Sequence, residues 1–375
     1  MWPLSDPLTA TGISPIARIP CPDELPLLIR LKYLTLAGRW TQLAVSPSPV
    51  TTLLRETAGD PSRSLVWNGL MKRYGVTDVL FAVLADKHGC WGWLDLWRTD
   101  PDDPFSVEEV GYLAAVVHDV TPALRHAISR QFITERFQGS EQVRSEPGGF
   151  GLQTSGVVRF GGAGTGGVNT NAARSADVPS AAVTSGAVRA RASAIGGGPR
   201  PDLPQQAVLT LDADMAVVGG TASVEEWLGL LQAGPRPFQR VPAEVLNVAA
   251  QLLAREAGVD HHPASARVHI GSGQWAILQA SRMDSTGTAA IPPLAVTIQA
   301  CPAEARLDMF ARSFGLTARQ RELLELAATG ADTNAMAAAL GIGAYTVQDQ
   351  FKQIFDTCGV HSRATLLALA IGTAQ

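Results

Sequence analysis

The feature that most constrains the fold is a long segment of small residues at 138–204. Gly, Ser, Ala and Thr dominate it, aromatic residues are nearly absent, and neither a helical nor a strand period persists. Such a segment buries too little apolar surface to offset the entropy of ordering it. We therefore expect a flexible linker here, with structured parts before and after it.

The remaining residues are apolar enough to form several cores. The chain has 375 residues, 46% of them hydrophobic, which predicts two or three domains. Its net charge of -4 argues against nucleic acid bound along the whole chain, so any DNA-binding role must be local. No apolar run approaches the roughly 20 residues that span a bilayer, and no secretory signal is evident at the N-terminus. Four scattered cysteines fit a reducing compartment, so we expect a cytoplasmic protein without membrane contact.

The first structured part, residues 22–137, is predicted to be an α+β module. The apolar run Asp78–Ala85 indicates a buried strand, residues 86–89 a turn, and the alternating run Cys90–Arg98 a second strand. A strand pair next to helices is typical of an α+β fold.

A helix should follow these strands. Ser106 and Glu109 have the spacing of a capping box, and the apolar run Val110–Val117 continues the helix. Pro122 lacks the amide hydrogen that a helix interior needs, so we expect it to end or kink this helix.

The second structured part, residues 205–300, has five short strands and an amphipathic helix. The helix Pro242–Ala257 is ended by Gly258. This order predicts one antiparallel sheet with helices on one side, a second α+β module. The expected strands are Ala207–Asp212, Ala216–Val218, Ala266–Ile270, Trp275–Ala280 and Leu294–Gln299.

The last part, residues 307–375, predicts an all-α domain of four helices. Capping residues and glycines mark where the helices begin and end. A short glycine-containing turn between the second and third helices is the pattern of a helix-turn-helix. The caps are Thr317, Asp332 and Ser362, and the glycines are Gly330, Gly341 and Gly359.

The third of these helices has one apolar face and one polar face. At about 100° per residue, Val347, Phe351, Ile354 and Phe355 fall together and should face the core. The opposite face is polar and able to meet base edges; it carries Tyr345, Asp349, Lys352 and Asp356, flanked by Gln348 and Gln353.

Three segments of this last part resemble the LuxR-type helix-turn-helix domain in order and spacing. Leu316–Gly330 is similar to the opening of that domain, Thr346–Phe355 to its recognition helix, and Gly359–Arg363 to the link to its last helix. More loosely, Cys90–Arg98 resembles a GAF-like module and Val241–Ala250 a PAS-like module of actinobacterial regulators. The resemblance implies a transcription regulator that binds double-stranded DNA as a homodimer.

Position by position, the resemblance also implies roles for individual residues. Thr346 would meet backbone phosphate, whereas Gln348, Asp349 and Lys352 would approach bases. Arg363 would contact phosphate or brace the domain. The fourth helix would be the dimerisation surface through Leu366, Leu367 and Ala370, although these residues can equally pack on the first helix.

Several features of the domain depart from the family pattern. Gly343 stands where a serine would cap the recognition helix, and Gln350 and Asn334 replace a frequent His and a frequent basic residue. From Leu307 onward, the chain has five Arg and Lys residues and six Asp and Glu residues, so this part carries no excess of positive charge. Because phosphate neutralisation supplies most non-specific affinity, we expect weak DNA binding by the domain alone. A helix-turn-helix that serves protein contacts only is the open alternative.

The sequence contains no catalytic constellation, so we expect no enzyme activity, no cofactor and no metal site. The His-containing stretch 260–262 favours a solvated loop over a metal site. Trp91, Trp93 and Trp97 are expected on one face of their strand, where they form either core or the wall of a pocket for a small-molecule effector.

Overall fold

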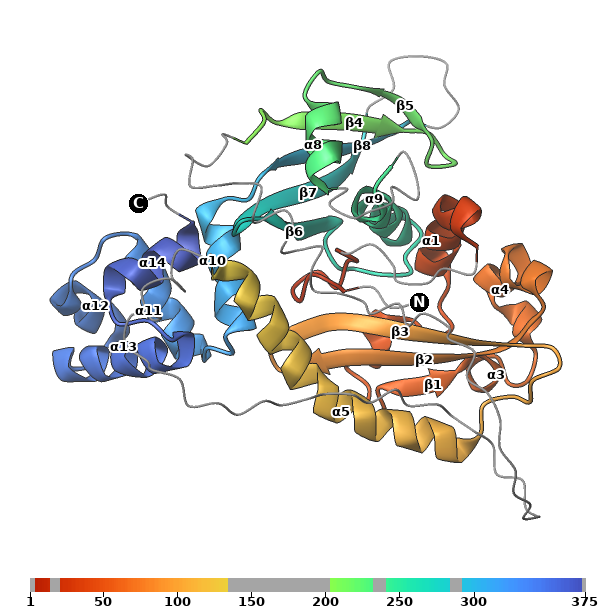
Figure 1. Cartoon of the computed structure of the whole chain (residues 1–375), viewed down its shortest axis with the longest axis horizontal. Coiled ribbons are helices and arrows are strands. Elements are labelled where there is room, and N and C mark those ends of the chain that lie inside the picture. The colour runs from red at the N-terminus through yellow and green to blue at the C-terminus, as the bar shows by residue number, and fades with distance from the viewer. Residues whose placement is uncertain (1–3, 14–20, 134–202, 232–240, 284–291, 373–375) are drawn as a thin grey trace, which may run out of the picture. The chain divides into compact units, whose positions relative to one another are not determined.

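The computed structural model describes residues 4–13, 21–133, 203–231, 241–283 and 292–372. These residues form two antiparallel sheets, each with its own helices, and a group of helices at the C-terminus (Figure 1). The α+β and all-α classes expected from the sequence are therefore confirmed. The predicted linker lies outside the described residues, apart from its last two positions.

The first sheet has the order β1–β2–β3, with the strands Val50–Thr52, Val76–Asp86 and Gly89–Thr99. β2 and β3 confirm the two expected strands. They meet at a tight turn, in which the carboxylate of Asp86 accepts the backbone N–H of His88 at 2.8 Å. Gly89 has a φ of 144°, a conformation that favours glycine.

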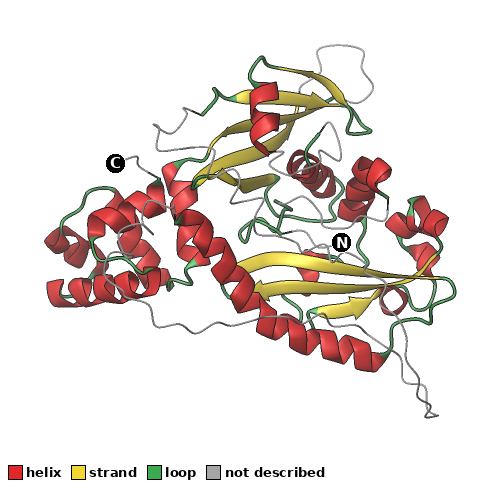
Figure 2. Ribbon diagram, in the orientation of Figure 1, coloured by secondary structure: helices red, strands yellow, loops and turns green. Residues whose placement is uncertain are grey.

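The helix α5 (Val107–Ser129) covers one face of this sheet (Figure 2). Ser106 and Glu109 form the expected capping box. Pro122 does not end the helix, because α5 continues through it to Ser129. Pro122 lies on the exposed side of the helix, where the carbonyl left without a donor can reach water.

The opposite face of the sheet is covered by helices from the first part of the chain. Trp40 stacks on Trp93 with centroids 4.3 Å apart, and Lys32 forms a buried ion pair with Asp95 at 2.7 Å. The helices between residues 22 and 74 are η1 (Pro22–Glu24), α1 (Leu25–Leu34), α2 (Trp40–Leu43), α3 (Leu53–Glu56), η2 (Pro61–Arg63), α4 (Leu65–Gly69) and η3 (Met71–Tyr74). A short η4 (Arg130–Phe132) follows α5.

The second sheet has the order β5–β4–β8–β7–β6, and all its pairings are antiparallel. The five expected strands are all present. The helix α9 packs against the three strands β6, β7 and β8. The elements are β4 (Ala207–Leu211), β5 (Val217–Gly220), α8 (Val224–Leu231), α9 (Ala243–Glu256), β6 (Ser265–Gly271), β7 (Gln274–Arg282) and β8 (Leu294–Ala300).

Two buried segments were not expected from the sequence. Residues 4–13, called the strap below, run beside β3 and are buried at nearly every position. The helix α10 (Ala303–Ser313) precedes the four predicted helices and begins after Pro302 with no capping side chain. Without a cap, the usual local signal of a helix start was absent.

Candidate nucleic-acid interface

Four C-terminal helices form the predicted helix-turn-helix domain. They are α11 (Ala318–Ala328), α12 (Thr333–Leu340), α13 (Ala344–Cys358) and α14 (Arg363–Ile371). The caps act as the sequence indicated: Thr317, Asp332 and Ser362 each accept a backbone N–H in the first turn of their helix.

The turn between α12 and α13 depends on glycine. Gly341 ends α12 with a φ of 64°, in the left-handed region where other residues are strained. Only residues 341–343 separate the two helices. This short connection restricts the orientation of α13 relative to α12.

The buried face of α13 anchors the helix in the domain. Val347, Phe351 and Ile354 are buried as predicted. Phe355, which was expected in the core, is only half-buried. Cys358, one turn after Ile354, is buried on the apolar face instead. The apolar face therefore runs along the whole length of α13.

The other face of α13 is open to solvent. Thr346, Gln348, Asp349 and Lys352 are all exposed, and Tyr345 is 83% exposed. One polar contact crosses this face: Gln353 Nε2 donates to Asp349 Oδ2 at 3.0 Å. The predicted base-reading residues thus lie side by side on one accessible surface.

Most cations of the C-terminal helices are already engaged. Arg312 pairs with Asp308 at 2.8 Å, and Arg319 with Glu322 at 2.9 Å. Arg321 lies 3.5 Å from Asp308. Among the described residues of this region, Lys352 alone of the five Arg and Lys residues has a side chain in no ion pair or hydrogen bond. Positive charge for phosphate is therefore scarce.

Comparison with known families decides what this domain is. Residues 315–370 match the family described as "Bacterial regulatory proteins, luxR family". These residues form a LuxR-family helix-turn-helix domain. The match spans the four helices α11 to α14 and leaves out α10.

Two solved structures also show limited similarity to the chain. A Vibrio cholerae VqmA–ligand–DNA complex is 19% identical over 49% of this chain and 86% of that chain, with a TM-score of 0.19. A VqmA dimer without target DNA is 20% identical over 46% of this chain and 83% of that chain, with a TM-score of 0.17. No curated protein shows significant similarity to the chain.

Arg363 acts inside the LuxR-family domain as a brace. Its guanidinium donates to the carbonyl of Ala331 and lies 5.3 Å from the ring centroid of Phe351. It therefore connects the start of α14 to the loop before α12 and to the core face of α13. Of the two roles expected for Arg363, the contacts favour the brace over the phosphate contact.

The residues expected on a dimerisation surface differ in exposure. Leu366 and Ala370 are fully buried, because α14 packs against α10, α11 and α13. Their burial fits the packing alternative, and as the helix stands they are closed to a second copy. Leu367 is half-buried, so it is the residue of the three that a partner could still contact.

The three tryptophans of β3 have separate surroundings. A bulge at Trp91 interrupts the strand's alternation, and its indole N–H donates to Asp86 at 2.9 Å. Trp93 is buried in the stack with Trp40, whereas Trp97 is half-buried. The indole N–H groups of Trp93 and Trp97 have no hydrogen-bond acceptor among the described residues. The prediction of one shared face is therefore wrong for Trp91.

In the stretch 260–262, only Asp260 departs from the expected solvated loop, because His261 is exposed and His262 is partly exposed. Asp260 is buried, where Arg39 Nε donates to it at 3.0 Å and His262 Nδ1 lies 2.7 Å away. These charges form a structural contact between the residue before α2 and the loop between α9 and β6. Across the described ranges, no group of three His, Cys, Asp or Glu residues is placed to hold a metal ion. No described helix is long and apolar enough to cross a membrane.

Proposed function

We propose that the chain is a transcription regulator that binds double-stranded DNA by inserting α13 into the major groove. The observation that supports this proposal most is the accessible polar face of α13, which belongs to a helix-turn-helix of the LuxR family. In such domains the second helix of the unit meets base edges. Gln348, Asp349 and Lys352 match adenine, cytosine N4 and guanine, respectively.

A dimer follows from the scarcity of free charge. One domain offers only Lys352 as a cation on this face, which gives too few phosphate contacts for useful affinity. Two domains on adjacent half-sites double the contacts. We place the homodimer contact of this domain on the exposed edge of α14 around Leu367, and the whole protein in the cytoplasm.

Control of DNA binding is assigned to the two α+β modules, the GAF-like one at 22–137 and the PAS-like one at 205–300. The effector would be a small molecule or a partner. The orphan N–H groups of Trp93 and Trp97 support a ligand on that face of β3, since buried donors favour an acceptor. A ligand there changes DNA binding only if it prefers one conformation of the chain.

The test of DNA recognition compares Lys352→Ala with Asp349→Ala on specific and scrambled duplexes at several salt concentrations. If Lys352 pairs with a base, its loss weakens specific binding by about 1–3 kcal/mol and relaxes one position per half-site. If it meets phosphate only, all sequences weaken alike and the salt slope falls by about one. Asp349→Ala should strengthen non-specific binding, because it removes a charge that repels phosphate.

One observation favours a second function, a helix-turn-helix used for protein contacts. The arginines of α10 and α11 are held by Asp308, Glu322 and Glu325, so this side of the domain presents balanced charge. Unchanged DNA binding in both variants at every salt concentration would exclude insertion of α13 and select this alternative.

A further inference from the structure

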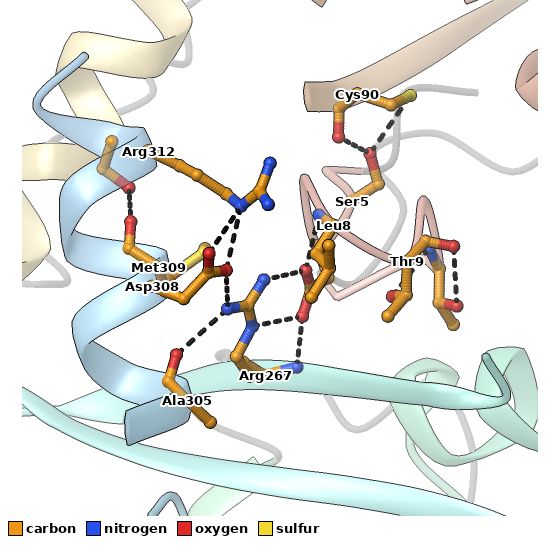
Figure 3. Close-up of polar contacts among 12 residues, drawn as sticks. Ser5, Leu8, Thr9, Cys90, Arg267, Ala305, Asp308, Met309 and Arg312 are labelled. Carbon is orange, nitrogen blue, oxygen red and sulfur yellow. Dashed lines mark hydrogen bonds and ion pairs between the residues drawn. The ribbon is translucent and has the colours of Figure 1, made fainter. Parts of the chain in front are cut away.

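The strap lies between the two α+β modules and bonds to both. On one side, Ser5 N donates to Trp91 O at 3.0 Å, and Ser5 Oγ donates to Cys90 O at 2.7 Å (Figure 3). On the same side, the indole of Trp40 donates to Ala10 O at 2.8 Å. The strap therefore extends the edge of the first sheet and is fastened to the layer over it.

Asp6 fastens the strap to the second sheet. Its carboxylate accepts three hydrogen bonds from Arg267 on β6: from Nη2 at 2.5 Å, Nε at 2.7 Å and the backbone N at 2.8 Å. Both side chains are almost fully buried. Burial alone would raise the pKa of Asp6, but the charge and hydrogen bonds of Arg267 hold it below the usual range. The carboxylate is thus ionised, and Arg267 supplies the positive charge that neutralises it.

The remaining arm of Arg267 reaches α10. Its Nη1 donates to Asp308 Oδ2 at 2.7 Å and to Ala305 O at 3.0 Å (Figure 3). The guanidinium of Arg267 thus binds the strap through Nε and Nη2 and binds α10 through Nη1. A planar fork of this kind permits little independent movement of its two partners.

Asp308 passes the connection on to the LuxR-family domain. It also accepts hydrogen bonds from Arg312, whose Nη1 donates to His88 O at 2.9 Å, and it lies 3.5 Å from Arg321 of α11. Arg306, two residues earlier on α10, donates to Leu369 O of α14 at 2.8 Å. Helix α10 therefore contacts both the first helix (α11) and the last helix (α14) of the LuxR-family domain.

We propose that the strap is an internal peptide ligand, anchored by Asp6, whose seating sets through Arg267 and Asp308 how firmly α10 and the LuxR-family domain are held. When the strap is seated, Arg267 is fixed and α10 is clamped between β6 and the β2–β3 turn. When it leaves, Arg267 loses its buried counter-charge at Asp6, and the clamp on α10 loosens. The strap is then a point at which a partner or a competing peptide acts on the DNA-binding domain.

The test measures hydrogen exchange in α10 of the full-length chain. Asp6→Asn keeps the shape of the side chain and removes its charge, so amides of α10 should exchange about tenfold faster or more. Asp214→Asn is the matched control, because it cuts an exposed ion pair with Arg30 and should leave α10 unchanged. Equal exchange of α10 in the wild type and Asp6→Asn would overturn the proposal.

A double-mutant cycle separates a relay from general loosening. In an Asp308→Asn background the ion pair between Arg267 and α10 is already removed and the hydrogen bond to Ala305 O remains. Adding Asp6→Asn should therefore accelerate exchange in α10 less than it does in the wild-type background. A full additive effect would show that Asp6 does not act through Arg267. As a second measurement, a fluorescent peptide with the sequence of residues 4–13 should bind the Asp6→Asn chain, and the same peptide carrying Asn at its third position should not. Equal binding of the two peptides would also reject the proposal, even if the variant chains are less stable.

Discussion

The guanidinium of Arg363 lies 5.3 Å from the ring centroid of Phe351, so the first residue of α14 is tied to the buried side of α13. The same side chain reaches Ala331 O in the loop between α11 and α12. The family resemblance implied that Arg363 contacts DNA phosphate or braces the domain. Its side chain is turned toward the inside of the domain. The stability of α13 therefore depends on Arg363.

We predict that Arg363→Ala lowers the free energy of unfolding of the domain by about 1–3 kcal/mol, since it removes a charged donor and packing on an aromatic ring. Arg363→Lys should recover only part of this, because an ammonium lacks the planar fork. Urea unfolding measures the loss. The slope of DNA affinity against salt should stay as in the wild type; a slope reduced by about one would show a phosphate contact instead.

The second prediction concerns Trp93. Trp93→Ala should cost about 3–5 kcal/mol of stability, because it leaves a cavity beneath Trp40. Trp93→Phe keeps an aromatic ring in the stack and removes an indole N–H that has no acceptor among the described residues. It should therefore cost much less than the alanine change. Thermal unfolding of the two variants gives the comparison.

The phenylalanine variant also tests the effector pocket. If a ligand accepts the N–H of Trp93, Trp93→Phe should weaken the effector response of a folded protein. A full response in Trp93→Phe, together with unfolding of Trp93→Ala, would mean that this tryptophan is core only.

A third prediction uses the missing cap of α13. Gly343 has φ -74° and ψ 152°, the backbone of an ordinary N-cap, and an added Cβ would approach only Thr346 Oγ1, at 3.9 Å. Gly343→Ser should raise the stability of the domain by about 0.5–1 kcal/mol. Gly343→Ala is the control, since it shares the loss of backbone freedom in the unfolded chain but provides no cap. Denaturation midpoints that do not distinguish Ser from Ala would show that no capping bond forms.

The sequence predicted those parts of the fold whose signals are local. The helix starts at Thr317, Asp332 and Ser362 could be predicted because a capping side chain accepts the backbone N–H of the residue three positions later. The apolar run of β2 and the alternation of β3 are equally local signals, and the side-chain facing expected for β3 failed at the bulge of Trp91. The exposed face of α13 could be derived because a helix fixes the direction of each side chain.

Long-range contacts could not be predicted in this way. The buried carboxylate of Asp6 pairs with Arg267, which lies 261 residues further along the chain. No local sequence pattern around either residue indicates the other as its partner. The burial of Asp260 likewise comes from Arg39, far away in sequence. The continuation of α5 through Pro122 could not be predicted for a related reason, because the position of the sheet decides which side of the helix meets water.

The last prediction concerns pH and Glu244, on α9. Glu244 is buried, and burial raises the pKa of its carboxyl from 4.5 to about 7, with only a partial opposing effect from its own backbone N–H. Since the folded pKa exceeds the unfolded one, the folded state holds this proton more tightly. The resulting stability is fully present below about pH 4.5 and is lost as the pH rises through about 7. A shift of this size corresponds to about 3 kcal/mol.

Glu244→Gln replaces the carboxyl with a neutral group of the same shape. The variant should match the wild type near about pH 4.5 and exceed its free energy of unfolding at about pH 8, by up to about 3 kcal/mol. Glu225→Gln, on the exposed side of α8, is the control and should follow the wild type at every pH. Chemical denaturation across this range measures both. If the Glu244→Gln and wild-type profiles run parallel, Glu244 is already ionised in the folded protein and its burial is compensated.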